Sequence, residues 1–299
     1  MNPPILFMKP HLILLLAGQL TSAGVPVKPA ACEMAALEAE QRAGAGEAAA
    51  MAELGRIYLK GKGRPQDPGK AMEWFLKGAA AGNPASQVGA GYLLSRGIGC
   101  RTDKLAAGDW FRRAAEQNDP KGQYNLALLL QEGSLGPGRI PEALVWFKKA
   151  ADQGMVEAQA TLGDMYFMAA EHVARDFAMA AFWLEKAAAG GDNHSRTVYG
   201  SMLRFGTGIP VDQPRAYQLF QKASTEGYSK AMCQLADMLA EGEGGVAKQP
   251  VAAAAWYHKA VSLGETAAKD RLKRLEATLT PEQATEAAQL ALKLLGGTP

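Results

Sequence analysis

The sequence predicts an all-α fold, an α-solenoid of about six helix-turn-helix repeats with capping helices at both ends. A tryptophan, replaced once by leucine, recurs along the 299 residues at intervals of 36 or 37. Its positions are Trp74, Trp110, Trp146, Trp183, Leu219 and Trp256. Self-similarity at such a period is typical of repeat arrays, in which each unit packs only against its neighbours.

Other residues recur in phase with the tryptophan. Alanine stands three residues before each of the six positions, and glycine or asparagine, which tolerate positive φ, stands eight residues after. An aspartate stands seven residues before in four of the six repeats, where it can cap a helix. The aspartates are Asp67, Asp103, Asp176 and Asp212. The repeated unit is therefore a pair of helices whose capping and turn residues recur at the same positions in most of the repeats.

The first repeat shows how the pair is built. Residues from about 48 to 60 form the first helix, helix A, because small and apolar residues recur three and four apart. Gly61 and Gly63 end it. Asp67 then caps the second helix, helix B, and Pro68 occupies its first turn, where no N–H is needed.

Helix A keeps a small residue at one position in every repeat. These residues are Gly55, Gly91, Ala127, Gly163, Gly200 and Ala236. A small residue lets two helices approach closely, and we expect the tryptophan of helix B to fill the space between them.

The turn between the helices differs in two repeats. The third has the segment GSLGPG at 133–138, and the fourth has AAEH at 169–172, with one residue inserted before Trp183. Helix A of the fourth repeat therefore either extends or is followed by a turn of another shape.

The N-terminus predicts a secretory signal peptide. Lys9 and His11 precede the apolar run 12–20, and small residues follow up to Ala23, where we expect the cut. The run is shorter than the roughly 20 residues that span a bilayer. We therefore expect a secreted or periplasmic protein with no stable membrane insertion after cleavage. An uncut or frayed N-terminus is the alternative.

The expected organisation follows from these boundaries. Residues 1–23 form the signal peptide, 24–46 a linker and an N-terminal capping helix, 47–264 the repeats, and 265–299 the C-terminal capping helices. The six repeats are expected at 47–82, 83–118, 119–154, 155–191, 192–227 and 228–264.

The repeat pattern resembles the Sel1-like repeat family. In the first repeat the matching residues are Leu54, Gly55, Tyr58, Gly61, Gly63, Asp67, Lys70, Ala71, Trp74, Phe75, Lys77, Ala79 and Gly82. The resemblance implies a tetratricopeptide-like solenoid that acts as a scaffold or adaptor, and exported bacterial members resemble regulators and assembly factors of the envelope. A branch of the family has a disulfide in each repeat, but this sequence lacks those cysteine pairs.

Composition and motifs argue against several other classes. The formal net charge is +2 and no basic run is present, so a nucleic-acid partner is not expected. The histidines lack metal-ligand spacing and no G-x-S-x-G motif occurs. We therefore expect no catalytic, cofactor-binding or metal-binding residues. Three cysteines, Cys32, Cys100 and Cys233, follow the expected cut and are interpreted as buried or unpaired, although a pair between chains is an alternative.

A basic residue stands three positions after each tryptophan position. The set is Lys77, Arg113, Lys149, Lys186, Lys222 and Lys259. It could bind an acidic partner, but a cation in the last turn of helix B is also favoured by the helix dipole and can cover apolar neighbours. Because the set follows the fold period without exception, the structural interpretation is preferred.

Positions that depart from the repeat are the candidates for partner binding. Projection of helix A places six such residues on its outward side: Tyr92, Asn125, Asp164, Arg204, Asp237 and Glu241. The sequence thus predicts a non-enzymatic scaffold of the bacterial cell envelope that binds a peptide or protein segment on a concave surface, with a regulatory or assembly role. The alternatives are an envelope enzyme, such as a cell-wall hydrolase or β-lactamase-like protein, and a cytosolic adaptor if the N-terminus is not a signal.

Overall fold

The computed structural model describes residues 31–169 and 173–296, and these residues contain fifteen α-helices and no β-strand. The all-α expectation is confirmed. The expected signal peptide and its cut after Ala23 lie outside the described residues, as does the part of the fourth turn at 170–172. Among the described helices, none is both long enough and apolar enough to cross a bilayer.

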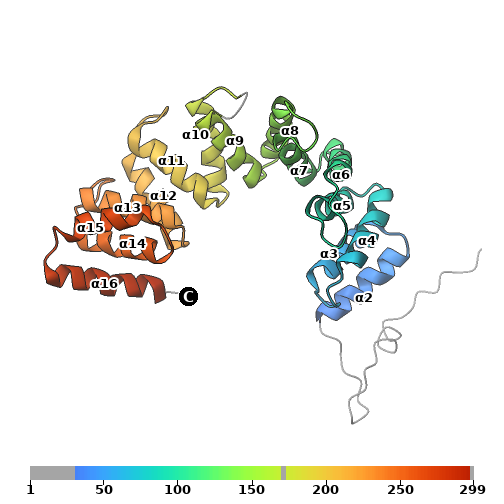
Figure 1. Ribbon diagram of the computed structural model, residues 1–299, viewed down its shortest axis with the longest axis horizontal. Helices are drawn as coiled ribbons and strands as arrows, with labels where there is room; N and C mark the ends of the chain where they lie inside the picture. Colours follow the sequence, from blue (N-terminus) through green and yellow to red (C-terminus); the bar gives the residue numbers. More distant parts are fainter. Residues whose placement is uncertain (1–30, 170–172, 297–299) are drawn as a thin grey trace, which may run out of the picture. The chain divides into compact units, whose positions relative to one another are not determined.

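The chain divides into two units between Pro137 and Gly138, within the expected third repeat. The helices of the first unit (Figure 1) are α2 (Ala31–Gly44), α3 (Ala48–Lys60), α4 (Pro68–Ala80), α5 (Pro84–Arg96), α6 (Lys104–Glu116) and α7 (Pro120–Gln131). The helices of the second unit are α8 (Ile140–Asp152), α9 (Val156–Met168), α10 (Phe177–Ala189), α11 (Asn193–Phe205), α12 (Gln213–Thr225), α13 (Ser229–Glu241), α14 (Pro250–Ser262), α15 (Ala267–Glu276) and α16 (Pro281–Gly296).

Within each unit the helices pack in chain order. Helix A corresponds to α3, α5, α7, α9, α11 and α13, and helix B to α4, α6, α8, α10, α12 and α14. Each packs on the helices before and after it in its unit, and successive A helices also touch: α3 contacts α5 and α5 contacts α7, while α9 contacts α11 and α11 contacts α13. Side chains on neighbouring A helices can therefore form joint sites.

The contact that sets the spacing of a helix pair joins the small residue of helix A to the residue after the tryptophan. A Cβ on Gly55 would lie 2.6 Å from the Phe75 ring, and one on Gly91 would lie 2.7 Å from the Phe111 ring. Gly200 meets Phe220, and Gly163 meets Leu184, in the same way. The expectation that tryptophan fills this space is therefore wrong, because the neighbouring residue is the one that packs against the glycine.

The tryptophans lie at the edge of the core and under the basic residues. Lys77 Nζ is 4.3 Å from the centre of the Trp74 ring, and the Arg113 guanidinium is 4.6 Å from that of Trp110. Lys149 Nζ is 4.0 Å from the Trp146 ring. Cation–π attraction thus adds to the helix dipole and supports the structural interpretation of the basic residues. The fourth repeat differs because Trp183 is only 2% exposed.

The expected helix caps and turn residues of the repeats are observed. All four aspartates accept a hydrogen bond from the backbone N–H three residues later, at 2.9–3.0 Å. The residues eight after the tryptophan position have positive φ, including Asn118 at 65°. Helix α9 ends at Met168 with Ala169 in the left-handed region, at φ 55°. Helix A of the fourth repeat therefore does not extend.

A row of buried polar side chains, which sequence analysis missed, joins successive repeats. Gln87 and Gln123 donate to the carbonyls of Ala79 and Ala115 at 3.5 and 3.4 Å. Gln159 donates to Ala151 at 3.1 Å, and Arg196 Nε donates to Ala188 at 3.1 Å. Each bond runs from helix A to the end of the preceding helix B, whose last carbonyls lack partners within the helix.

The N-terminal helix α2 takes the place of a helix B. A Cβ on Gly63 would lie 2.0 Å from the carbonyl oxygen of Cys32, in the first turn of α2. Gly99 stands in the same relation to Pro68, the first residue of α4, 31 residues earlier in each case. The capping role of α2 is therefore confirmed by its use of the contact between repeats.

The C-terminal helices cover the last repeat. Both α15 and α16 pack against α14, and Lys259 of α14 donates to the carbonyl of Leu294. Thr280 and Gln283 form a reciprocal capping box at the start of α16, with bonds of 3.0 and 3.3 Å. The expected C-terminal capping helices are present.

The contact between repeats at the second turn glycine can be tested with Gly99→Ala and the control Gly82→Ala. Both glycines have positive φ, at 70° and 83°, so each alanine should cost about 1 kcal/mol of backbone strain. At Gly99 the new Cβ would also lie 2.7 Å from Pro68, whereas nothing lies within 4 Å at Gly82. We expect Gly99→Ala to lower the free energy of unfolding by about 1–3 kcal/mol more than Gly82→Ala, as measured by urea denaturation. Equal losses would contradict the contact.

Candidate functional site

The six candidate residues fall into three groups on the A helices. Tyr92 and Asn125 line one pocket in the first unit. In the second unit Asp164 pairs with a histidine, and Arg204, Asp237 and Glu241 share one network.

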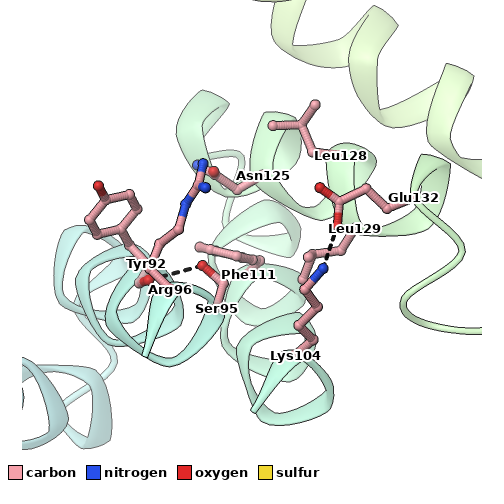
Figure 2. Close-up of a pocket in the computed structure, with 9 residues that line it drawn as sticks. All are labelled: Tyr92, Ser95, Arg96, Lys104, Phe111, Asn125, Leu128, Leu129 and Glu132. Atoms are coloured by element: carbon pink, nitrogen blue, oxygen red, sulfur yellow. Dashed lines mark hydrogen bonds and ion pairs between the residues drawn. The ribbon is translucent and has the colours of Figure 1, made fainter. Parts of the chain in front are cut away.

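The pocket of the first unit lies among α5, α6 and α7 and has a volume of about 80 Å³ (Figure 2). The lining residues are Tyr92, Ser95, Arg96, Lys104, Phe111, Asn125, Leu128, Leu129 and Glu132. The ring of Phe111, 1% exposed, belongs to the core, while Tyr92 is 42% exposed. Sequence analysis missed Arg96, because a basic residue at a helix C-terminus is ordinary.

One of the two cations at the pocket already has an acidic partner. Lys104 Nζ lies 2.9 Å from Glu132 Oε2 and 3.2 Å from Ser134 Oγ. The hydrogen bond from Lys104 holds the pKa of Glu132 below its usual value. Arg96 forms no ion pair with any residue in the described ranges, although its charge also helps to lower the pKa of Glu132, and the pocket carries a formal charge of +1.

Asp164 lies within a group that spans three A helices. His194 Nε2 lies 3.0 Å from both carboxylate oxygens of Asp164, and the hydroxyl of Tyr228 lies 3.4 Å from His194 Nδ1. Hydrogen bonding to Asp164 raises the pKa of His194, although burial opposes the rise. The group links α9, α11 and the N-cap residue of α13.

Arg204 is the centre of a largely buried charge network. Its side chain is 5% exposed, and its Nε lies 2.6 Å from Glu243 Oε2. Its terminal nitrogens lie 3.4 Å from Glu241 and 3.8 Å from Asp237. The expectation that Arg204 faces outward is therefore wrong: this charge is buried because acidic side chains from α13 and the turn after it surround it.

The acidic residues of the network are unequal. Asp237 is 20% exposed and also accepts from Tyr257 and Arg271, so it holds α13 to α14 and α15. Glu241 remains 63% exposed. A shared hydrogen bond with Glu243 raises the pKa of Glu241, while the hydrogen bond from Arg204 lowers the pKa of Glu243. Of this network, only Glu241 has a largely exposed carboxylate.

Among the described residues, the remaining reactive side chains form no metal-binding cluster. In the described part of the chain, no group of three or more His, Cys, Asp and Glu residues is placed to hold a metal ion. Cys32, Cys100 and Cys233 are free thiols, and burial raises the pKa of Cys233 to about 11. A buried thiol with a raised pKa is a poor nucleophile.

The family follows from the repeats themselves. The family model described as Sel1 repeat matches residues 48–83, 84–119, 120–155, 156–192, 197–228 and 229–265. The chain belongs to the Sel1 repeat family. Sel1 repeat proteins generally mediate protein–protein interactions and are typically non-catalytic.

Solved structures of Sel1 repeat proteins share the fold. A Sel1 repeat protein from Oxalobacter formigenes has 32% identity and a TM-score of 0.70, over 84% of this chain and 71% of that one. A protective antigen present in uropathogenic Escherichia coli strains, which displays an SLR fold, has 25% identity and a TM-score of 0.59. The match covers 88% of this chain but only 64% of the antigen. No curated protein matches the chain.

The His194–Asp164 pair should make stability depend on pH. Because the pKa of His194 is raised in the folded state, its contribution is fully present below its unfolded pKa of about 6.5 and is lost as pH rises through the folded value. We expect His194→Gln to lower the free energy of unfolding by up to about 1 kcal/mol near pH 5.5, since the pair is partly exposed, and by much less near pH 8.5. Urea denaturation at both pH values measures this. In an Asp164→Asn background the pH-dependent difference should disappear, and its persistence would assign it to another group.

The buried network predicts a larger loss at Arg204 than at an exposed arginine. Arg204→Met leaves three acidic side chains without their central cation and should cost about 3 kcal/mol. The control Arg215→Met removes a pair with Glu185 whose side chains are 47% and 46% exposed, and should cost less than about 1 kcal/mol. Thermal and urea unfolding compare the two variants. Similar small losses would show that the Arg204 network contributes little to stability.

Proposed function

We propose that this Sel1 repeat protein is a non-enzymatic scaffold or adaptor of the bacterial cell envelope that binds a peptide or protein segment along its A helices. The observation that carries the proposal is the match of six Sel1 repeats, a family that generally mediates protein–protein interactions.

The distribution of side chains supports the A helices as the binding face. Helix B carries the phenylalanines that pack on helix A and the tryptophans covered by cations. Much of the surface of helix B is therefore occupied by contacts within the fold. Within each unit, successive A helices touch one another. In the first unit they bring Tyr92 and Asn125 to one pocket, and in the second unit Glu241 keeps an exposed carboxylate. A segment lying across the A helices of one unit would meet different polar groups in successive repeats, which is how a repeated scaffold acquires specificity.

The size of the pocket at Tyr92 argues against a small-molecule site at that place. Sites for small molecules and cofactors usually measure about 300–1,000 Å³. The pocket at Tyr92 measures about 80 Å³, which suits one side chain of a bound segment. The surface of the A helices, with its several polar groups, fits a regulatory or assembly role in which a partner protein is bound.

The envelope location rests on the N-terminal pattern, with cleavage after Ala23. N-terminal sequencing of protein from the periplasmic and cytosolic fractions measures this part of the proposal. A mature chain that begins at Gly24 in the periplasm is the expected result. An intact N-terminus in the cytosol would instead make the protein a cytosolic adaptor.

The binding face can be tested with a photo-crosslinking residue at two positions of matched exposure. Tyr92 of α5 is 42% exposed, and Leu76 of α4 is 40% exposed. We expect Tyr92→p-benzoylphenylalanine to give discrete protein adducts in envelope fractions and Leu76→p-benzoylphenylalanine to give few, because only the first lies on an A helix. Mass spectrometry identifies the adducts. No adduct at Tyr92, or equal capture at both positions, would overturn the proposed face.

A further inference from the structure

The pocket among α5, α6 and α7 has the features of a site for one negative charge. We propose that Arg96 and Asn125 bind the side-chain carboxylate of an aspartate or glutamate in the partner segment. The inference rests on the proposed peptide-binding function and names the chemistry that the pocket selects.

The state of Arg96 is the first observation. The other arginines of the first unit include Arg42, which pairs with Glu47 and Glu53, and Arg64, which lies 2.7 Å from Glu40. Arg96, like Arg56 and Arg101, has no such pair among the described residues, but it ends α5 at a pocket that also holds an acidic side chain. That side chain, Glu132, is already bound by Lys104. The guanidinium therefore keeps its fork of donors for a ligand, a geometry that matches a carboxylate.

Asn125 supplies a second donor at the same side of the pocket. Figure 2 shows the Arg96 side chain extending from α5 toward the Asn125 side chain on α7. Asn125 Nδ2 donates one hydrogen bond to the Lys121 carbonyl at 2.8 Å, and a side-chain amide has a second N–H to donate. A carboxylate between the two helices can accept from both groups, while Tyr92 and Leu128 offer apolar surface to its methylene groups.

The charge of the pocket favours a carboxylate over a phosphate group. Arg96 and Lys104 contribute two positive charges and Glu132 one negative charge, which leaves a formal charge of +1. A monoanion neutralises this charge. A phosphorylated side chain carries about −1.5 to −2 at neutral pH and would leave excess negative charge beside Glu132.

The first experiment uses a small probe that needs no known partner. N-acetyl-glutamate N-methylamide is titrated into the full chain while the Arg96 Nε and Asn125 Nδ2 signals are followed by NMR. The glutamine analogue is the neutral control. We expect both signals to move with the glutamate probe, at affinities of about millimolar for so small a ligand, and not with its analogue. No movement, or equal movement with both probes, overturns the proposal.

The second experiment selects peptides from a random library whose members are acetylated and amidated, so that only side chains carry carboxylates. The chain is compared with Arg96→Gln and with Arg101→Gln, a control at an exposed arginine of the α5–α6 turn. We expect the unmodified chain and the control to enrich one aspartate or glutamate position, and Arg96→Gln to lose this preference. A selected peptide should bind Arg96→Gln about tenfold or more weakly. Changing its acidic residue to the amide should then cost little further, as a double-mutant cycle requires.

The outcomes separate this inference from the proposed function. Bound peptides without an acidic preference would refute the carboxylate site and leave peptide binding intact. No bound peptide, with Arg96 still responding to the glutamate probe, would keep the site and refute peptide binding. A library with free C-termini forms the last arm, and binding through Arg96 only in that arm would overturn the side-chain proposal in favour of a terminal carboxylate.

Discussion

The spacing of each helix pair depends on one contact, between a small residue on helix A and a large apolar side chain on helix B. At Gly55 and Gly91 even a methyl group would overlap the facing phenylalanine ring. Since each repeat packs only on its neighbours, a fixed distance within pairs carries through each unit. The adjacent tryptophan is thereby placed at the core's edge, where Trp74 lies beneath Lys77. The start of helix B then contacts a turn glycine of the next repeat, and its end accepts a hydrogen bond from a buried glutamine of that repeat.

The periodicity of the sequence was sufficient to predict the helices, the aspartate caps, the positive φ positions and both capping regions. It could not tell which large residue enters the helix pair. Trp74 and Phe75 are neighbours, and their positions recur with the same period, so their separation carries no information about burial. The glycine on helix A packs against only one face of helix B. Consecutive residues on a helix point in directions that differ by roughly 100°, so only one of the two residues can lie on that face. Only the packed structure distinguishes them.

The candidate sites were less predictable because they join different positions of different repeats. Asp164 meets His194, and Lys104 meets Glu132, across separations of 30 and 28 residues. A comparison of the repeats aligns residues that are 36 or 37 positions apart, so it does not show that these residues form pairs. Arg204 became a binding candidate because it departs from the repeat on the side of helix A that was projected to face outward. A buried arginine departs from the pattern as well when three acidic side chains compensate it, so departure alone does not separate a binding residue from a structural one.

The contrast between Arg204 and Arg96 gives a better criterion for this fold. Both are arginines near the end of an A helix, and both have an acidic residue of the next repeat nearby, Glu132 for Arg96 and Glu241 for Arg204. The Arg204 side chain is 5% exposed and has acidic partners within the unit, so it can hold helices together but has little capacity left for a ligand. Near Arg96, the neighbouring glutamate, Glu132, forms its ion pair with Lys104 instead. In a scaffold whose repeats share one geometry, binding capacity therefore lies where a charged group stays exposed and outside any ion pair beside a small pocket.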